Sequence, residues 1–279
     1  MKKIIITISL ILLLTGCSTT FVYNNIDWWI DWYVDDYVEL SKQQQKAFDA
    51  ALTELHDWHR ETQLPEYVNQ LISLKEQVNR GITEQELVEH QEAVRVHWKT
   101  LMTKAAPEIA KLSKMLTKEQ IKDLKGNIEK DNQKKWREFE ALSMKEWRKE
   151  RQDEQIQDLK EWVGKLDDKQ KAKINELSLG YQRTFIHWME YREQWQGVFF
   201  DLIDNEQLSK NYVLALSDLM INGRDKYRTD EYLEISNANN KVAQSIMLYQ
   251  LTNLSSKQKR KFNREIENLI EDLTDLITD

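Results

Sequence analysis

Residues that break helices are scarce along this chain, and this scarcity decides its fold class. Two prolines and seven glycines occur among 279 residues, against usual frequencies of roughly 5% and 7%. The tight turns of β-hairpins draw on these residue types, so few hairpins can form. Apolar side chains recur instead at i, i+3 and i+4, which places them on one face of a helix. We therefore predict an all-α protein, an elongated bundle of about nine or ten helices.

Five short motifs indicate where helices begin. Each has an apolar residue, an N-cap residue with a side-chain oxygen, and Gln or Glu three positions after the cap. In this arrangement the two side chains satisfy two backbone N–H groups that would otherwise lack a partner. The pairs are Ser41/Gln44, Thr83/Glu86, Thr117/Gln120, Asp167/Gln170 and Ser255/Gln258. Helix capping alone explains these motifs, and their irregular spacing argues against a solenoid of fixed repeat length.

Prolines and glycines indicate several other boundaries. A first helix is expected over residues 24–38. Pro65 suits the first turn of a later helix, which Gly81 would end as a left-handed cap. Pro107 is expected to open a short separate helix, because proline inside a helix removes a backbone hydrogen bond. One further helix is expected from residue 167 towards residue 203.

A densely charged stretch runs from Thr117 to about Trp162, and residues 117–166 form a possible sub-boundary of the helical domain. As one helix it would be about 65 Å long at 1.5 Å per residue, longer than a compact domain. We expect it to protrude, to pair, or to be interrupted near Leu142-Ser143. Its thin apolar stripe fits either a solvated member of the bundle or a partner-binding arm.

The N-terminus is similar to a bacterial lipoprotein export signal. Two lysines precede an apolar run that closes on Leu14, Thr15, Gly16 and Cys17. The run is too short for the roughly 20 residues of a membrane-spanning helix, so it is typical of a cleaved signal. The closing pattern, L-[AST]-[GA]-C, resembles the site that lipoprotein maturation enzymes recognise, which implies lipid on the Cys17 sulfur.

This resemblance divides the chain into three parts. We predict a signal peptide over 1–16, a lipid-anchored linker over 17–23 and an all-helical periplasmic domain over 24–279. Acyl chains such as palmitate contribute about 0.8 kcal/mol per buried methylene, enough to hold the domain on a bilayer. Ser18 is not the aspartate that resembles an inner-membrane retention signal. An outer-membrane anchor that faces the periplasm is therefore favoured.

Cysteine and charge content exclude several function classes. Cys17 is the only cysteine, so once it is acylated the chain has neither an intramolecular disulfide nor a free catalytic thiol. The net charge is −7. Binding to nucleic acid rewards clustered Lys and Arg, so we predict no nucleic-acid partner.

The first expected helix carries three carboxylates on one face. Asp27, Asp31 and Asp35 are spaced at i, i+4 and i+8. They form either an acidic docking strip or cation site, or a set of salt bridges to the many Lys and Arg residues of the chain. Trp28 and Trp32 lie on another face, where they either pack in the core or contact lipid headgroups.

The histidines show no catalytic signature. His56 and His59 share one helical face, but a metal site would need further ligands that the sequence does not reveal. The chain has no Glu-x-x-His, no G-x-S-x-G and no Gly-rich phosphate loop. We predict that the protein is not an enzyme and binds no metal or cofactor.

Two resemblances to known families add to this interpretation. The L-[ST]-x-x-Q motifs are similar to the paired motif of small helical, ATP-independent periplasmic chaperones and of helical foldases for secreted lipases, five residues at a time. Along most of its length the chain also resembles an uncharacterised family of Gram-negative helical lipoproteins. This resemblance rests on residues 23–28, 31–38, Ser41, Trp58-His59 and Leu64-Pro65. The first resemblance implies a chaperone function, and the second supplies no activity.

Taken together, the sequence predicts an outer-membrane-anchored periplasmic lipoprotein with a non-enzymatic interaction or envelope-scaffold role. Its partner is expected to be an envelope protein that the sequence does not identify. A chaperone-like holdase for unfolded envelope proteins is the first alternative. A helical hydrolase or metal-binding protein is the second.

Overall fold

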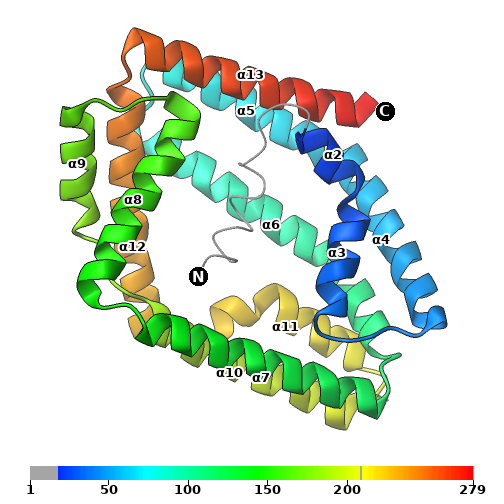
Figure 1. The fold of residues 1–279 in the computed structure, drawn as a ribbon. Helices are drawn as coiled ribbons and strands as arrows, with labels where there is room; N and C mark the ends of the chain where they lie inside the picture. Colours follow the sequence, from blue (N-terminus) through cyan, green and yellow to red (C-terminus); the bar gives the residue numbers. More distant parts are fainter. Residues whose placement is uncertain (1–17, 208, 279) are drawn as a thin grey trace.

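A computed structural model describes residues 18–207 and 209–278, and every regular element within them is a helix (Figure 1). The all-α prediction is therefore confirmed. None of the helices in this part of the chain is both long and apolar enough to cross a membrane. The helices are α2 (Ser18–Asn24), α3 (Ile26–Asp35), α4 (Lys42–Thr62), α5 (Leu64–Arg80), α6 (Glu84–Ser113), α7 (Lys118–Glu140), α8 (Met144–Val163), α9 (Asp168–Ser178), α10 (Phe185–Glu206), α11 (Tyr212–Tyr227), α12 (Asp230–Thr252) and α13 (Ser256–Thr278).

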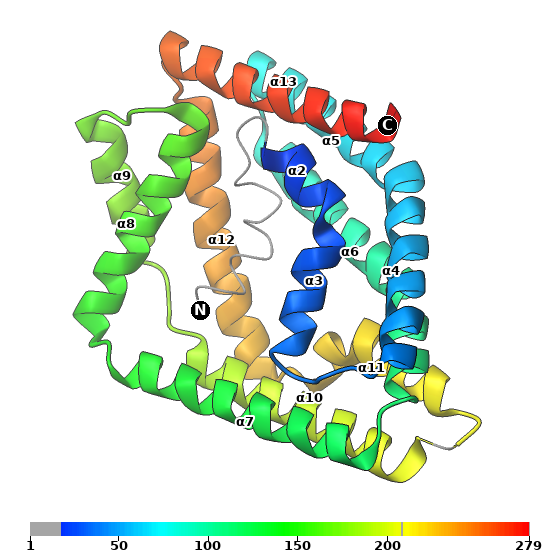
Figure 2. The ribbon, with the colours of Figure 1, turned by 45° about the vertical axis from the view of Figure 1, so that its right-hand side comes forward.

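Groups of helices lie along the four sides of a frame that α6 crosses, an arrangement that the sequence did not predict (Figure 1). Figure 1 shows α13 beside α5 along the top and α7 beside α10 along the bottom, and both pairs are in contact. α9 packs against α8 and α12 on a third side, while α4 packs against α5 and α6 on the fourth. In the turned view the four sides remain separate (Figure 2).

The apolar core is divided among these sides. One cluster joins the α5–α6 turn to α8, α9, α12 and α13, and a second joins α6 and α7 to α10 and α11. A third cluster lies between α5 and α13 and includes Tyr23 of α2 at its edge. Because each cluster draws on helices distant in sequence, burial holds the frame together at several separate places.

The expected caps are present. Side chain and backbone bond reciprocally at Ser41, Thr83, Thr117 and Asp167, and the same two bonds form between Ser255 and Gln258. Gly81 ends α5 with φ 98°, the left-handed conformation expected there. The charged stretch is interrupted between α7 and α8 as expected, and a further capping box, Ser143 with Glu146, starts α8.

Three expected boundaries were wrong. Pro107 lies inside α6 rather than opening a helix, because Ala110 is fully buried against α11 and this packing continues the helix. The expected helix over 167–203 is two helices, since Asn239 of α12 bonds both the N–H and the carbonyl of Gln182 at 2.9 and 2.8 Å. The helix expected over residues 24–38 corresponds to α3, which ends at Asp35 instead of residue 38.

The expected linker over 17–23 is helical in its described part. α2 begins at Ser18, and Tyr23 packs at the edge of the cluster between α5 and α13. That contact gives the segment a partner for its apolar side chains, which an unstructured linker would lack. The chain after Cys17 is therefore held against the helical domain.

Candidate functional site

The starts of α4 and α7 are joined by two glutamine side chains. The amide of Gln44 donates to Gln120 Oε1 at 2.8 Å and to the backbone carbonyl of Met115 at 2.7 Å. Gln120 donates in return to Gln44 Oε1 at 2.8 Å and to the carbonyl of Glu39 at 2.7 Å. Each Oε1 also accepts the N–H of its own N-cap residue. Both amides therefore use their full hydrogen-bonding capacity.

The same arrangement joins the starts of α9 and α13. Gln170 donates to Gln258 Oε1 and to the carbonyl of Asn253, both at 3.0 Å. Gln258 donates to Gln170 Oε1 at 2.8 Å and to the carbonyl of Lys165 at 3.0 Å. Both side chains are buried. We call each of these two sets a glutamine interlock, and they lie at diagonally opposite corners of the frame in Figure 1.

The chemistry of the third residue after the cap separates interlocks from plain caps. Only an amide can accept the N-cap N–H through oxygen and also donate to another helix through nitrogen; a carboxylate only accepts. All four motifs with Gln at this position take part in interlocks. Glu86 and Glu146, by contrast, sit in boxes on the surface.

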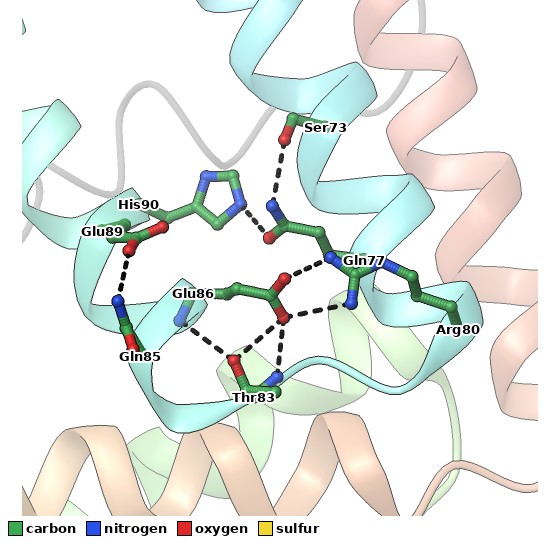
Figure 3. A network of polar contacts seen from close by, with 8 residues as sticks. All are labelled: Ser73, Gln77, Arg80, Thr83, Gln85, Glu86, Glu89 and His90. Carbon is green, nitrogen blue, oxygen red and sulfur yellow. Dashed lines mark hydrogen bonds and ion pairs between the residues drawn. The ribbon is translucent and has the colours of Figure 1, made fainter.

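The α5–α6 turn shows such a surface box in detail (Figure 3). Glu86 accepts hydrogen bonds from Thr83 and pairs with Arg80. The Arg80 guanidinium and the Thr83 backbone N–H lower the pKa of Glu86 to about 2. Beside it, His90 Nε2 lies 2.8 Å from Gln77 Oε1. These contacts fix the turn, and all the residues drawn in this close-up belong to α5, α6 or the turn between them.

Histidines and tyrosines connect α2 to the helical domain. The hydroxyl of Tyr23 lies 3.0 Å from Nδ1 of His59, and the Tyr67 hydroxyl lies 3.2 Å from Nε2 of the same ring. A neutral imidazole accepts with one nitrogen and donates with the other, so it can bond both hydroxyls. Burial, helped by nearby His56, lowers the pKa of His59 to about 4. The ring is therefore neutral at pH 7.

The three predicted carboxylates do not converge on one another. Asp31 accepts a hydrogen bond of 2.6 Å from Gln45 of α4, while Asp27 and Asp35 are exposed. Within residues 18–207 and 209–278, no three His, Asp or Glu side chains lie where they could together hold a metal ion. Whether the exposed pair forms a docking strip stays a prediction.

Aromatic side chains cover an exposed face of α3. Trp28, Trp29, Trp32 and Tyr33 are 61%, 40%, 54% and 51% exposed. At 100° per residue these four positions occupy one continuous arc of the helix, and Ile30 lies on the opposite side. We call these four residues the α3 aromatic surface. The predicted lipid site before it, Leu14, Thr15, Gly16 and Cys17, lies outside the described residues.

A second exposed apolar site lies midway along α6. Val94 and Trp98 are one helical turn apart and are 47% and 50% exposed. The helix is held on both sides of them, because Leu87 and Ala106 are buried. This exposed pair and the glutamine interlocks were missed in the sequence. The interlocks had a readable signal, the use of Gln rather than Glu.

Comparisons with known proteins give a family and an attachment site. The model of a family of unknown function, DUF6279, matches residues 36–233, and a prokaryotic membrane lipoprotein lipid attachment site matches residues 1–18. The searches of curated proteins and of solved structures return no match. The chain belongs to this family of unknown function and carries a lipoprotein attachment signal, which confirms the resemblance to uncharacterised helical lipoproteins.

Proposed function

We propose that this member of the family is anchored in the outer membrane, faces the periplasm, and acts without catalysis by binding another protein of the cell envelope. The exposed pair Val94 and Trp98 on α6 is the observation that carries the proposal. Tryptophan is enriched among the residues that contribute most to protein interfaces. α6 is packed against α4, α11 and α12, so it presents this pair on a supported helix.

The predicted anchor can be tested by removing its acceptor. When the mature chain with Cys17→Ser is exported behind a signal peptide that is cleaved without lipid attachment, we expect a shift from the membrane fraction to the soluble fraction, because no acyl chain can be attached. Thermal unfolding should be unchanged, since the helices of the described structure begin after Cys17. Ser18→Asp is the matched variant: it keeps the lipid and should move the protein to the inner-membrane band of a density gradient. Retention of Cys17→Ser in washed membranes would contradict the anchor.

The partner can be captured at position 98. A photo-crosslinking phenylalanine analogue in place of Trp98 is expected to yield a discrete cross-linked band in intact cells, because a bound partner would lie within reach. The control places the same analogue at Glu92, an exposed charged residue of α6. Equal labelling at both positions, or none at position 98, would contradict a binding site there.

A holdase is the second candidate, and the glutamine interlocks favour it. The resemblance to periplasmic chaperones concerns a paired motif, and here the L-[ST]-x-x-Q motifs of α4 and α7 are joined in a pair. The experiment at Trp98 separates the two functions. A holdase would cross-link to many clients and give a broad distribution of masses, whereas a scaffold would give one or a few bands.

A further inference from the structure

The α3 aromatic surface is distinct from the other exposed apolar side chains of the described residues. Those elsewhere are mainly aliphatic, and Trp98 is the one other exposed tryptophan. Between residues 18 and 41, by contrast, five aromatic side chains are exposed: Phe21, Trp28, Trp29, Trp32 and Tyr33. Amphipathic rings of Trp and Tyr are favoured at the boundary between lipid headgroups and acyl chains.

The lipid attachment site keeps this surface close to a bilayer. Trp28 follows Cys17 by eleven residues, and α2 occupies most of that interval. At 1.5 Å per residue, a helical connection of this length spans about 17 Å. The α3 aromatic surface is thus held within a short distance of the point where the acyl chains enter the membrane.

The aromatic arc of α3 lies on a different side of the helix from the residue that bonds α4. Asp31 is bonded to Gln45, which fixes the acidic side of the helix towards α4. The rings of Trp28 and Trp29 contact each other edge to face, with centroids 4.7 Å apart. A stable helix therefore presents an ordered aromatic face away from α4.

We infer that the α3 aromatic surface rests in the headgroup region of the bilayer that holds the lipidated Cys17, and so fixes the orientation of the frame on the membrane. The charge of the segment specifies the lipid. Residues 18–41 carry five carboxylates and no Lys or Arg, so anionic headgroups repel this segment. Zwitterionic headgroups are the preferred surface. The inference holds whichever membrane carries the anchor.

Flotation with lipid vesicles tests the inference on the mature chain carrying Cys17→Ser. We expect measurable, reversible binding to phosphatidylethanolamine–phosphatidylcholine vesicles at high lipid concentration, and weaker binding as phosphatidylglycerol is added. Replacing the four residues of the α3 aromatic surface by Ser should lower the partition coefficient at least about tenfold. Trp98→Ser, an equally exposed tryptophan on α6, should change it less than about twofold. Circular dichroism establishes that each variant is folded.

Three results would overturn the inference. The first is failure of the Cys17→Ser protein to bind zwitterionic vesicles at any lipid concentration. The second is a loss of binding in Trp98→Ser as large as that in the fourfold variant. The third is dimerisation: light scattering without lipid would show a dimer that the fourfold variant converts to a monomer, which would assign the surface to a second copy of the chain. Each of these results leaves the cross-linking test at Trp98 unaffected, so the two proposals can fail separately.

Discussion

Replacing Gln258 by Glu is expected to lower the free energy of unfolding by about 3 kcal/mol. The carboxylate can still accept the N–H of Ser255, so the cap survives. It can no longer donate to the carbonyl of Lys165 or to the buried Oε1 of Gln170, so both acceptors lose this donor. It also places a charge at a buried position, which costs further free energy. Urea denaturation followed by circular dichroism measures the loss.

Glu146→Gln is the matched control for this substitution. It replaces Glu by Gln at the same position, the third after the N-cap, in a capping box that lies on the surface. Because either side chain can accept the N–H of Ser143, we expect the free energy of unfolding to change by less than about 0.5 kcal/mol. If Gln258→Glu cost no more than Glu146→Gln, the interlock would add nothing to helix capping.

Helix capping could be predicted from the sequence because it is local. The cap and its partner are three residues apart, and their chemistry alone indicates the bond. The interlock is not local: Gln44 and Gln120 are 76 residues apart, and Gln170 and Gln258 are 88 apart. Only the preference for Gln over Glu pointed to a second partner, and it did not say which motif that partner was.

The two interlocks also show a correspondence between halves of the chain that the spacing concealed. In the first half an interlock joins α4 to α7, and in the second it joins α9 to α13. α7 then packs along α10, while α13 packs along α5. The last helix of each half therefore packs against a helix of the other half. The second half also contains α11, which packs on α6, and the paired glutamines are 76 residues apart in the first half and 88 apart in the second.

The candidate surfaces were partly readable in the sequence. Helical spacing placed Trp28 and Trp32 on one face and the three aspartates on another, and both statements follow from geometry alone. Whether the aromatic face was packed or exposed depended on what lies beside α3. The bond between Asp31 and Gln45 decides this, because it turns the acidic side towards α4. Such a contact has no signature in a single sequence.

Acidification is expected to destabilise the protein through His59. Its pKa is lowered to about 4 in the folded protein, from 6.5 in the unfolded chain, chiefly by burial. Between these values the unfolded chain binds more protons, so the stabilisation is fully present above pH 6.5 and is lost as the pH falls. From pH 7 to pH 5 this group alone should lower the free energy of unfolding by about 2 kcal/mol. His56, His90 and His97 also have lowered pKa values and act in the same direction.

Two substitutions separate titration of His59 from loss of its hydrogen bonds. His59→Gln keeps a side chain that can both donate and accept but cannot titrate, so the difference in stability between pH 7 and pH 5 should shrink by about 2 kcal/mol. Tyr67→Phe removes one hydroxyl partner and leaves the imidazole buried. It should lower stability at both pH values and keep the pH dependence. Equal pH dependence in wild type and His59→Gln, measured by urea denaturation, would mean that other groups dominate. Loss of the pH dependence in Tyr67→Phe would instead make the hydrogen bond, rather than burial, the cause of the lowered pKa.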